Sequence, residues 1–170
     1  MKKYRIELKW ALIFVGMMLT WMLLERLSGL HDEHISQHEV YTNFVAIPAI
    51  AVYVFALLDK RKNFYKGSMT YMQGLISGLV ITLIVSLISP ATQYITSAII
   101  SPNYFQNVIA YAVSTGKMTQ EAAEAYFNLK NYLIQTVIFT PIMGVMTAAV
   151  VAIFTRRKGT QALAPESAAS

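Results

Sequence analysis

The stretch from Lys66 to Ile88, KGSMTYMQGLISGLVITLIVSLI, constrains the fold of this chain more than any other part of it. No charged residue occurs from Met69 to Ile88. Such a run can cross a hydrocarbon core of roughly 30 Å as a helix, because a helix rises about 1.5 Å per residue. The sequence therefore predicts a membrane-spanning helix here.

Composition extends this prediction to the whole chain. Of the 170 residues, 55% are hydrophobic and only 14% are charged, whereas about a quarter is typical of soluble proteins. We predict an all-α fold with four transmembrane helices in one membrane domain, residues 1–158. The spans lie at about 8–27, 41–58, 68–89 and 132–155, and residues 159–170 form a disordered cytoplasmic tail.

Residues 90–131 are predicted to form an extracytoplasmic extension and a short helical hairpin between the third and fourth spans. Ser101-Pro102 breaks the chain, and Asn103 to Ser114 then carries its apolar residues on one helical face. Gly116 is a natural helix stop, and Thr119 can cap the next helix.

The basic residues predict the orientation in the membrane. Eleven of the 14 Lys and Arg residues lie within residues 1–9, between the second and third spans, or after the fourth. The positive-inside rule therefore places both termini in the cytoplasm. Because these charges flank apolar segments instead of forming one soluble face, no nucleic-acid partner is expected.

Small and weakly polar residues recur at every fourth position in the third and fourth spans. They are Thr70, Gly74, Gly78, Thr82 and Ser86 in the third span, and Thr140, Gly144, Ala148 and Ala152 in the fourth. Small residues let helix backbones approach closely in lipid, so we expect the two spans to pair through these faces. A homodimer contact is the alternative use of either face.

Three histidines lie in the first polar loop, and they are the candidate metal ligands. His31, His34 and His38 are spaced i, i+3 and i+7, which on a helix would place three imidazoles on one face. Solvated side chains are the more common outcome in a polar, acidic loop, so no metal site is assigned.

The sequence offers no catalytic or cofactor-binding residues, and neither an enzyme nor a cofactor is expected. The four charge-free runs contain no carboxylate and no basic side chain, which argues against a proton-coupled transporter. Polar residues of the third span could line a neutral pathway, but they more often bond across helices or to their own backbone. They are Gln73, Thr82, Ser86, Ser89 and Gln93.

Three functions remain open. The first is a non-enzymatic membrane component that contacts the lipid bilayer and binds itself or another membrane protein. The second is a small channel or transporter for an uncharged or small solute. The third, weaker alternative is divalent-metal binding in the first extracytoplasmic loop.

Several segments together resemble a known family. A basic turn precedes FYKGSMTYMQGLISGLVITLIVSLI, and after a proline-containing extension GKMTQEAAEAYFNLKNY leads into a helix ending in Arg-Arg-Lys. From about Lys3 to Lys158 the chain resembles domain-of-unknown-function family 4199, small four-helix membrane proteins chiefly of Bacteroidetes. The resemblance implies four spans and an inner-membrane location, and it brings no established activity.

Overall fold

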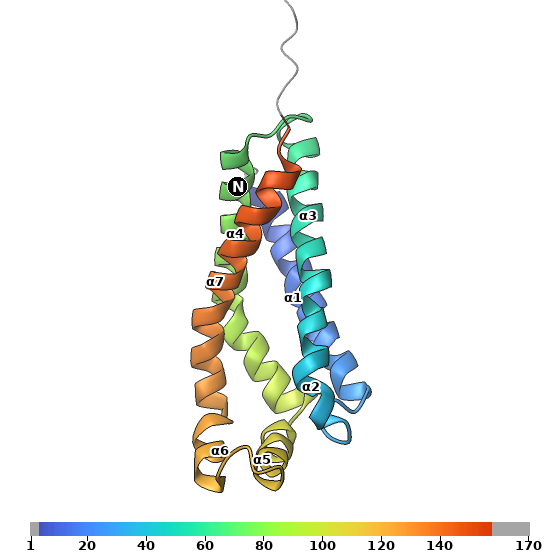
Figure 1. The fold of residues 1–170 in the computed structure, drawn as a ribbon. Coiled ribbons are helices and arrows are strands. Elements are labelled where there is room, and N and C mark those ends of the chain that lie inside the picture. The colour runs from blue at the N-terminus through green and yellow to red at the C-terminus, as the bar shows by residue number, and fades with distance from the viewer. Residues whose placement is uncertain (1–3, 158–170) are drawn as a thin grey trace, which may run out of the picture.

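A computed structural model describes residues 4–157 of the protein, so the predicted tail at residues 159–170 lies outside the described residues. The described chain is almost entirely helical (Figure 1). In chain order the elements are α1 (Arg5–Leu27), α2 (Ile35–Tyr41), the 3-10 turn η2 (Thr42–Val45), α3 (Ala46–Asn63), α4 (Tyr71–Ile95), the π-helical turn η3 (Thr96–Ile100), α5 (Tyr104–Ser114), α6 (Gln120–Tyr126) and α7 (Leu129–Thr155).

Four helical segments are long and apolar enough to cross a membrane: Arg5–Leu27, Ile35–Asn63, Tyr71–Ile100 and Leu129–Thr155. The prediction of an all-α, four-span membrane protein is confirmed. The third segment is longer than predicted, because α4 continues through Pro90 and into η3. Pro48 lies in the first turn of α3, where the missing N–H of a proline costs little.

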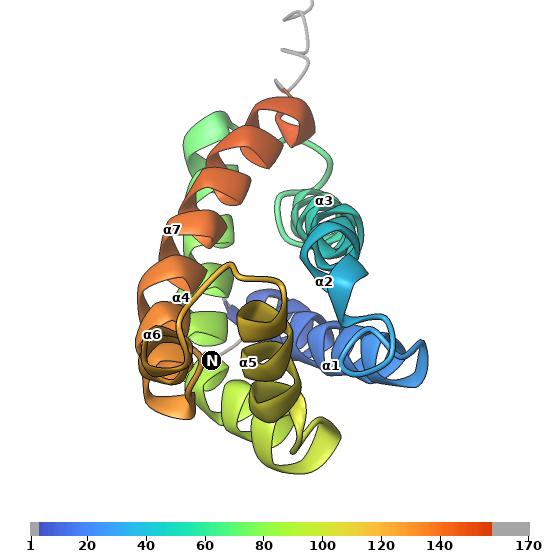
Figure 2. The same ribbon diagram turned by 60° about the horizontal axis from the view of Figure 1, so that its bottom comes forward.

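The two ends of the bundle carry different parts of the chain. The start of α1, the α3–α4 loop and the end of α7 lie at one end, which we call the terminal end (Figure 1). The helices α2, α5 and α6 lie at the other end, which we call the α5 end (Figure 2). Both ends of the described chain therefore share one side of the bundle.

The helices α4 and α7 make the closest contact in the bundle. A Cβ atom added at Gly78 would lie 2.6 Å from the Cβ of Ala148, and one added at Gly144 would lie 2.5 Å from Cγ2 of Thr82. At Gly74 the added atom would lie 3.3 Å from Cβ of Ala152. Glycine at these positions lets the two backbones approach, and a side chain there would push them apart.

The other small residues of the two faces have different places. Thr70 is exposed and caps α4, accepting from the backbone N–H of Gln73, whose side chain accepts from the N–H of Thr70. Gln73 therefore belongs to a helix cap and not to a pathway. The Ser86 hydroxyl is buried without a hydrogen-bond partner, and Thr140 lines a cavity.

A buried ion pair joins α1 to α3. The Nζ atom of Lys60 lies 2.8 Å and 3.1 Å from the two carboxylate oxygens of Glu7, and each side chain is 2% exposed. Lys60 also lies 3.8 Å from the centroid of the Phe64 ring. The pair lies just outside the predicted spans 8–27 and 41–58 but inside the longer helical segments Arg5–Leu27 and Ile35–Asn63. The sequence interpretation treated Lys60 as an exposed topology signal, whereas the fold brings it against a carboxylate 53 residues away.

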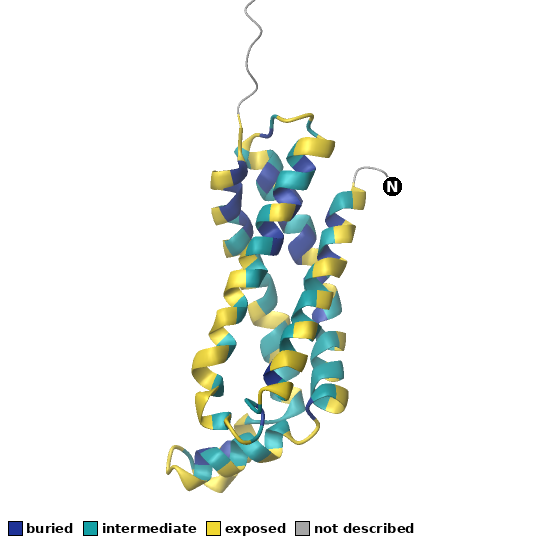
Figure 3. Cartoon of the chain, turned by 90° about the vertical axis from the view of Figure 1, so that its right-hand side faces the viewer, coloured by how far each residue is buried: buried dark blue, intermediate teal, exposed yellow. Residues whose placement is uncertain are grey.

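Buried residues gather in the half of the bundle nearest the terminal end (Figure 3). There, Met69 and Arg157 exchange backbone hydrogen bonds of 2.9 Å and 2.8 Å, which tie the start of α4 to the end of α7. Toward the α5 end, α4 separates from α7 and η3 contacts α1 (Figure 1). Most of the buried residues thus lie nearer the terminal end, and α4 and α7 diverge toward the α5 end.

We predict that Gly78→Leu destabilises the protein by about 3 kcal/mol, because its side chain would overlap Ala148. The matched control is Gly16→Leu in α1, where an added Cβ meets no atom within 4 Å. Thermal unfolding of both variants in detergent, followed by size-exclusion chromatography, measures the difference. Equal unfolding midpoints would contradict the close α4–α7 contact.

We predict that Lys60→Met costs about 3 to 5 kcal/mol, because it removes the cation from the buried Glu7 carboxylate. The double variant Glu7→Met with Lys60→Met removes both charges and recovers most of that stability. The same unfolding assay compares them. A double variant less stable than Lys60→Met would show that the pair itself provides the stability.

Candidate functional site

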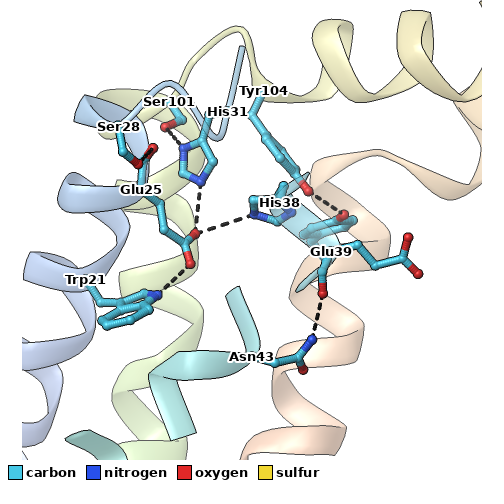
Figure 4. A network of polar contacts seen from close by, with 10 residues as sticks. Trp21, Glu25, Ser28, His31, His38, Glu39, Asn43, Ser101 and Tyr104 are labelled. Atoms are coloured by element: carbon cyan, nitrogen blue, oxygen red, sulfur yellow. Dashed lines mark hydrogen bonds and ion pairs between the residues drawn. The ribbon is translucent and has the colours of Figure 1, made fainter. Parts of the chain in front are cut away.

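The candidate site is built around the carboxylate of Glu25, two residues before the end of α1. This residue is 3% exposed. One turn earlier, the indole N–H of Trp21 donates to Glu25 Oε1 across 2.5 Å. The other oxygen, Oε2, faces two imidazoles (Figure 4). The carboxylate is therefore held in one orientation with one oxygen directed at histidines.

His31 reaches Glu25 from the turn that follows α1. Gly29 makes this turn possible by adopting a φ of +77°, a conformation that L side chains rarely adopt. His31 Nε2 lies 3.1 Å from Glu25 Oε2, and Nδ1 lies 2.5 Å from the Ser101 hydroxyl oxygen at the end of η3. Both ring nitrogens are thus engaged, and the ring is 2% exposed.

His38 approaches the same oxygen from α2. Its Nε2 lies 3.4 Å from Glu25 Oε2, which is within ion-pair distance. The two atoms are not aligned for a hydrogen bond, and this buried nitrogen has no hydrogen-bond partner. The side chain is 17% exposed. Of the two imidazoles, His38 is therefore the one with an uncommitted nitrogen.

Tyr104, the first residue of α5, covers the two imidazoles. Its ring centroid lies 5.2 Å from that of His31 and 5.3 Å from that of His38. Its hydroxyl lies 3.4 Å from the Tyr132 hydroxyl on α7. Burial raises the pKa of Tyr104 above its usual range, so the phenol stays protonated and neutral. We call Glu25, His31, His38 and Tyr104 the histidine cluster.

The structure separates the three histidines that the sequence grouped together. His31 and His38 meet, but His34 is exposed and its Nδ1 donates to the Ser28 carbonyl across 3.1 Å. The proposed single helical face is wrong because α2 begins only at Ile35, so His31 lies in the preceding turn.

One cavity adjoins the histidine cluster, and a second cavity lies beside the first. The first, of about 190 Å³, is lined by His31, His38 and Tyr104, among other residues. The second, of about 150 Å³, lies among α1, α4 and α7 and shares Met22, Gln93 and Thr96 with the first. Its polar lining consists of Ser89, Thr92, Gln93, Thr96, Thr136 and Thr140.

The hydroxyls of the second cavity are partly committed to their own helix. Ser89 donates to the Ser86 carbonyl and Thr92 donates to the Ser89 carbonyl. Each hydroxyl oxygen keeps lone pairs as acceptors. Of the polar residues predicted for a pathway, Ser89 and Gln93 line this cavity, whereas Thr82 bonds to Tyr53 and to the Gly78 carbonyl.

Sequence reasoning missed Glu25, Ser101 and Tyr104 as members of the site. The i, i+4 spacing of Trp21 and Glu25 was a usable local signal, because such residues share a helical face. Ser101 is 70 residues from His31, and no local pattern connects them.

Comparison with known proteins identifies the family but brings no activity. Residues 9–157 match the family described as "Protein of unknown function (DUF4199)". No curated protein and no solved structure matches the chain. Because the match covers most of the chain and four helices can span a membrane, this protein belongs to the DUF4199 family of unknown function and is a multi-pass membrane protein.

Proposed function

We propose that this protein is a non-enzymatic component of the cytoplasmic (inner) membrane, with both termini in the cytoplasm, that holds and passes a small polar solute. The observation that supports this proposal best is a pair of neighbouring cavities whose walls combine apolar side chains with hydroxyl and amide groups. They lie among helices that can span a bilayer. In that environment a hydroxyl or amide group is unfavourable unless it has a hydrogen-bond partner, which a polar solute can provide.

The chemistry of the cavities suggests the kind of solute. Ser89 and Thr92 give their hydroxyl protons to backbone carbonyls, so their oxygens offer acceptor lone pairs to the cavity. Gln93 and Thr136 already meet at 3.4 Å. A small, uncharged solute with hydrogen-bond donors, such as a polyol, matches a lining of this kind.

Partner binding is the other function that the sequence left open. The small-residue faces of α4 and α7 contact each other at Gly78 and Gly144, so these glycines are not available to a partner. We propose the lipid bilayer as the partner of the outward apolar side chains. A second copy, or another membrane protein, would have to bind on that same lipid-facing surface.

The orientation is supported by charge and by the fold together. Within residues 4–157, eight Lys and Arg residues belong to the segments at the terminal end and three to the segments at the α5 end. One of them, Lys60, is paired with Glu7, which still leaves the terminal end far more basic than the α5 end. By the positive-inside rule the α5 end, with the histidine cluster, faces away from the cytoplasm.

Cysteine labelling tests the orientation cleanly, because the natural chain contains no cysteine. We predict that Ser114→Cys at the end of α5 reacts with a membrane-impermeant maleimide in intact spheroplasts. Lys62→Cys, exposed at the end of α3, should react only after the membrane is opened. The reverse labelling pattern would contradict cytoplasmic termini.

Proteoliposome permeability tests the proposed passage. We predict that wild-type protein raises glycerol permeability in a stopped-flow swelling assay, and that Thr96→Leu removes this increase. Thr96 lines both cavities, so the larger apolar side chain would fill space in both and remove a hydroxyl from their walls.

The control is Thr20→Leu, the same change at an exposed position on α1. It should retain the permeability of the wild type. Two results would contradict the proposal: wild-type liposomes no more permeable than protein-free liposomes, or equal loss in both variants.

A further inference from the structure

We propose that Glu25, His31 and His38 form a binding site for one divalent transition-metal ion, with zinc as the reference metal. The carboxylate comes from α1, the first imidazole from the turn after it and the second from α2 (Figure 4). One ligand atom from each residue lies within 4.8 Å of the other two. The site differs from the three-histidine set suggested by sequence, because Glu25 replaces His34.

The distances fit a tetrahedral ion. Zinc bonds to nitrogen and oxygen are about 2.0 to 2.1 Å long, so neighbouring ligand atoms of a tetrahedral zinc are about 3.3 to 3.4 Å apart. Glu25 Oε2 lies 3.1 Å from His31 Nε2 and 3.4 Å from His38 Nε2. Two of the three edges therefore need almost no adjustment.

The surroundings orient the ligands. Metal-binding imidazoles usually donate their other ring N–H to a fixed acceptor, and the Ser101 hydroxyl lies 2.5 Å from His31 Nδ1. Trp21 holds Glu25 Oε1, so Oε2, which faces both imidazoles, is the oxygen placed to bind the ion. The buried Nε2 of His38, which has no hydrogen-bond partner, would gain one strong bond.

The ligand set selects the class of metal. Two imidazoles and one carboxylate suit zinc and its neighbours, whereas calcium and magnesium prefer oxygen ligands alone. Three protein ligands leave a fourth position, which would face the cavity of about 190 Å³ lined by His31, His38 and Tyr104. A water molecule can fill that position.

This inference does not depend on solute passage, because binding is measured directly on the full-length protein in detergent. Isothermal titration with Zn²⁺, and metal content after dialysis, should give one ion per chain for the wild type. Magnesium should not compete.

Variants identify the ligands. His38→Ala and Glu25→Gln should each weaken Zn²⁺ binding by more than about 100-fold, and Ser101→Ala by about 10-fold. The matched control is His34→Ala, in the same loop but directed at the Ser28 carbonyl, which should bind as the wild type does. Full affinity in His38→Ala, or equal loss in His34→Ala, would overturn the proposed site.

A measurement on the wild-type protein tests the site even if a variant fails to fold. Co²⁺ bound tetrahedrally by nitrogen and oxygen gives intense visible absorption that Zn²⁺ should abolish by displacement. Wild-type protein that binds neither ion would overturn the inference, whatever the variants do. His38→Ala is the variant of choice because it removes no hydrogen bond from His38 Nε2.

Discussion

The contact between Gly78 and Ala148 is the constraint on which the rest of the bundle depends. Lipid tails are as apolar as leucine side chains, so burying apolar surface between helices gains little in a membrane. Close backbone approach replaces that gain with dispersion and weak Cα–H to oxygen contacts. The close approach joins α4 to α7, and the backbone hydrogen bonds between Met69 and Arg157 hold the start of α4 to the end of α7. The Glu7–Lys60 ion pair joins α1 to α3.

The two halves of the molecule consequently have different characters. Near the terminal end, small residues and a paired buried charge lie at the contacts between helices. Toward the α5 end, α4 continues past Pro90 into η3, which contacts α1, and cavities with some polar side chains in their walls remain among the spans. The histidine cluster lies where this polar half meets α2 and α5, and its side chains are contributed by four separate parts of the chain.

The sequence predicted what is periodic or local, and it failed where distant residues meet. Charge-free runs identified the spans, because each helix must satisfy its own backbone in lipid. Thr70 was misread because a helix start and a packing face share the same residue types. Lys60 and Glu7 looked like ordinary flanking charges, and only the fold could bring them together across 53 residues. His34 was grouped wrongly because the helix begins after it, at Ile35.

Because α7 is held closely to α4 over only part of its length, a small change in its tilt moves its N-terminal end. The last close contact of α7 with α4 is at Gly144, and from there to Leu129 the helix is about 22 Å long at about 1.5 Å per residue, so a tilt of one degree about Gly144 moves the far end by about 0.4 Å. A tilt of a few degrees therefore changes the distance between α1 and α7 at the α5 end by about the radius of a water molecule. The width of the cavity beside Thr136 and Gln93 therefore depends on the tilt angle between α7 and α4, and the small residues at the contact between these two helices set that angle.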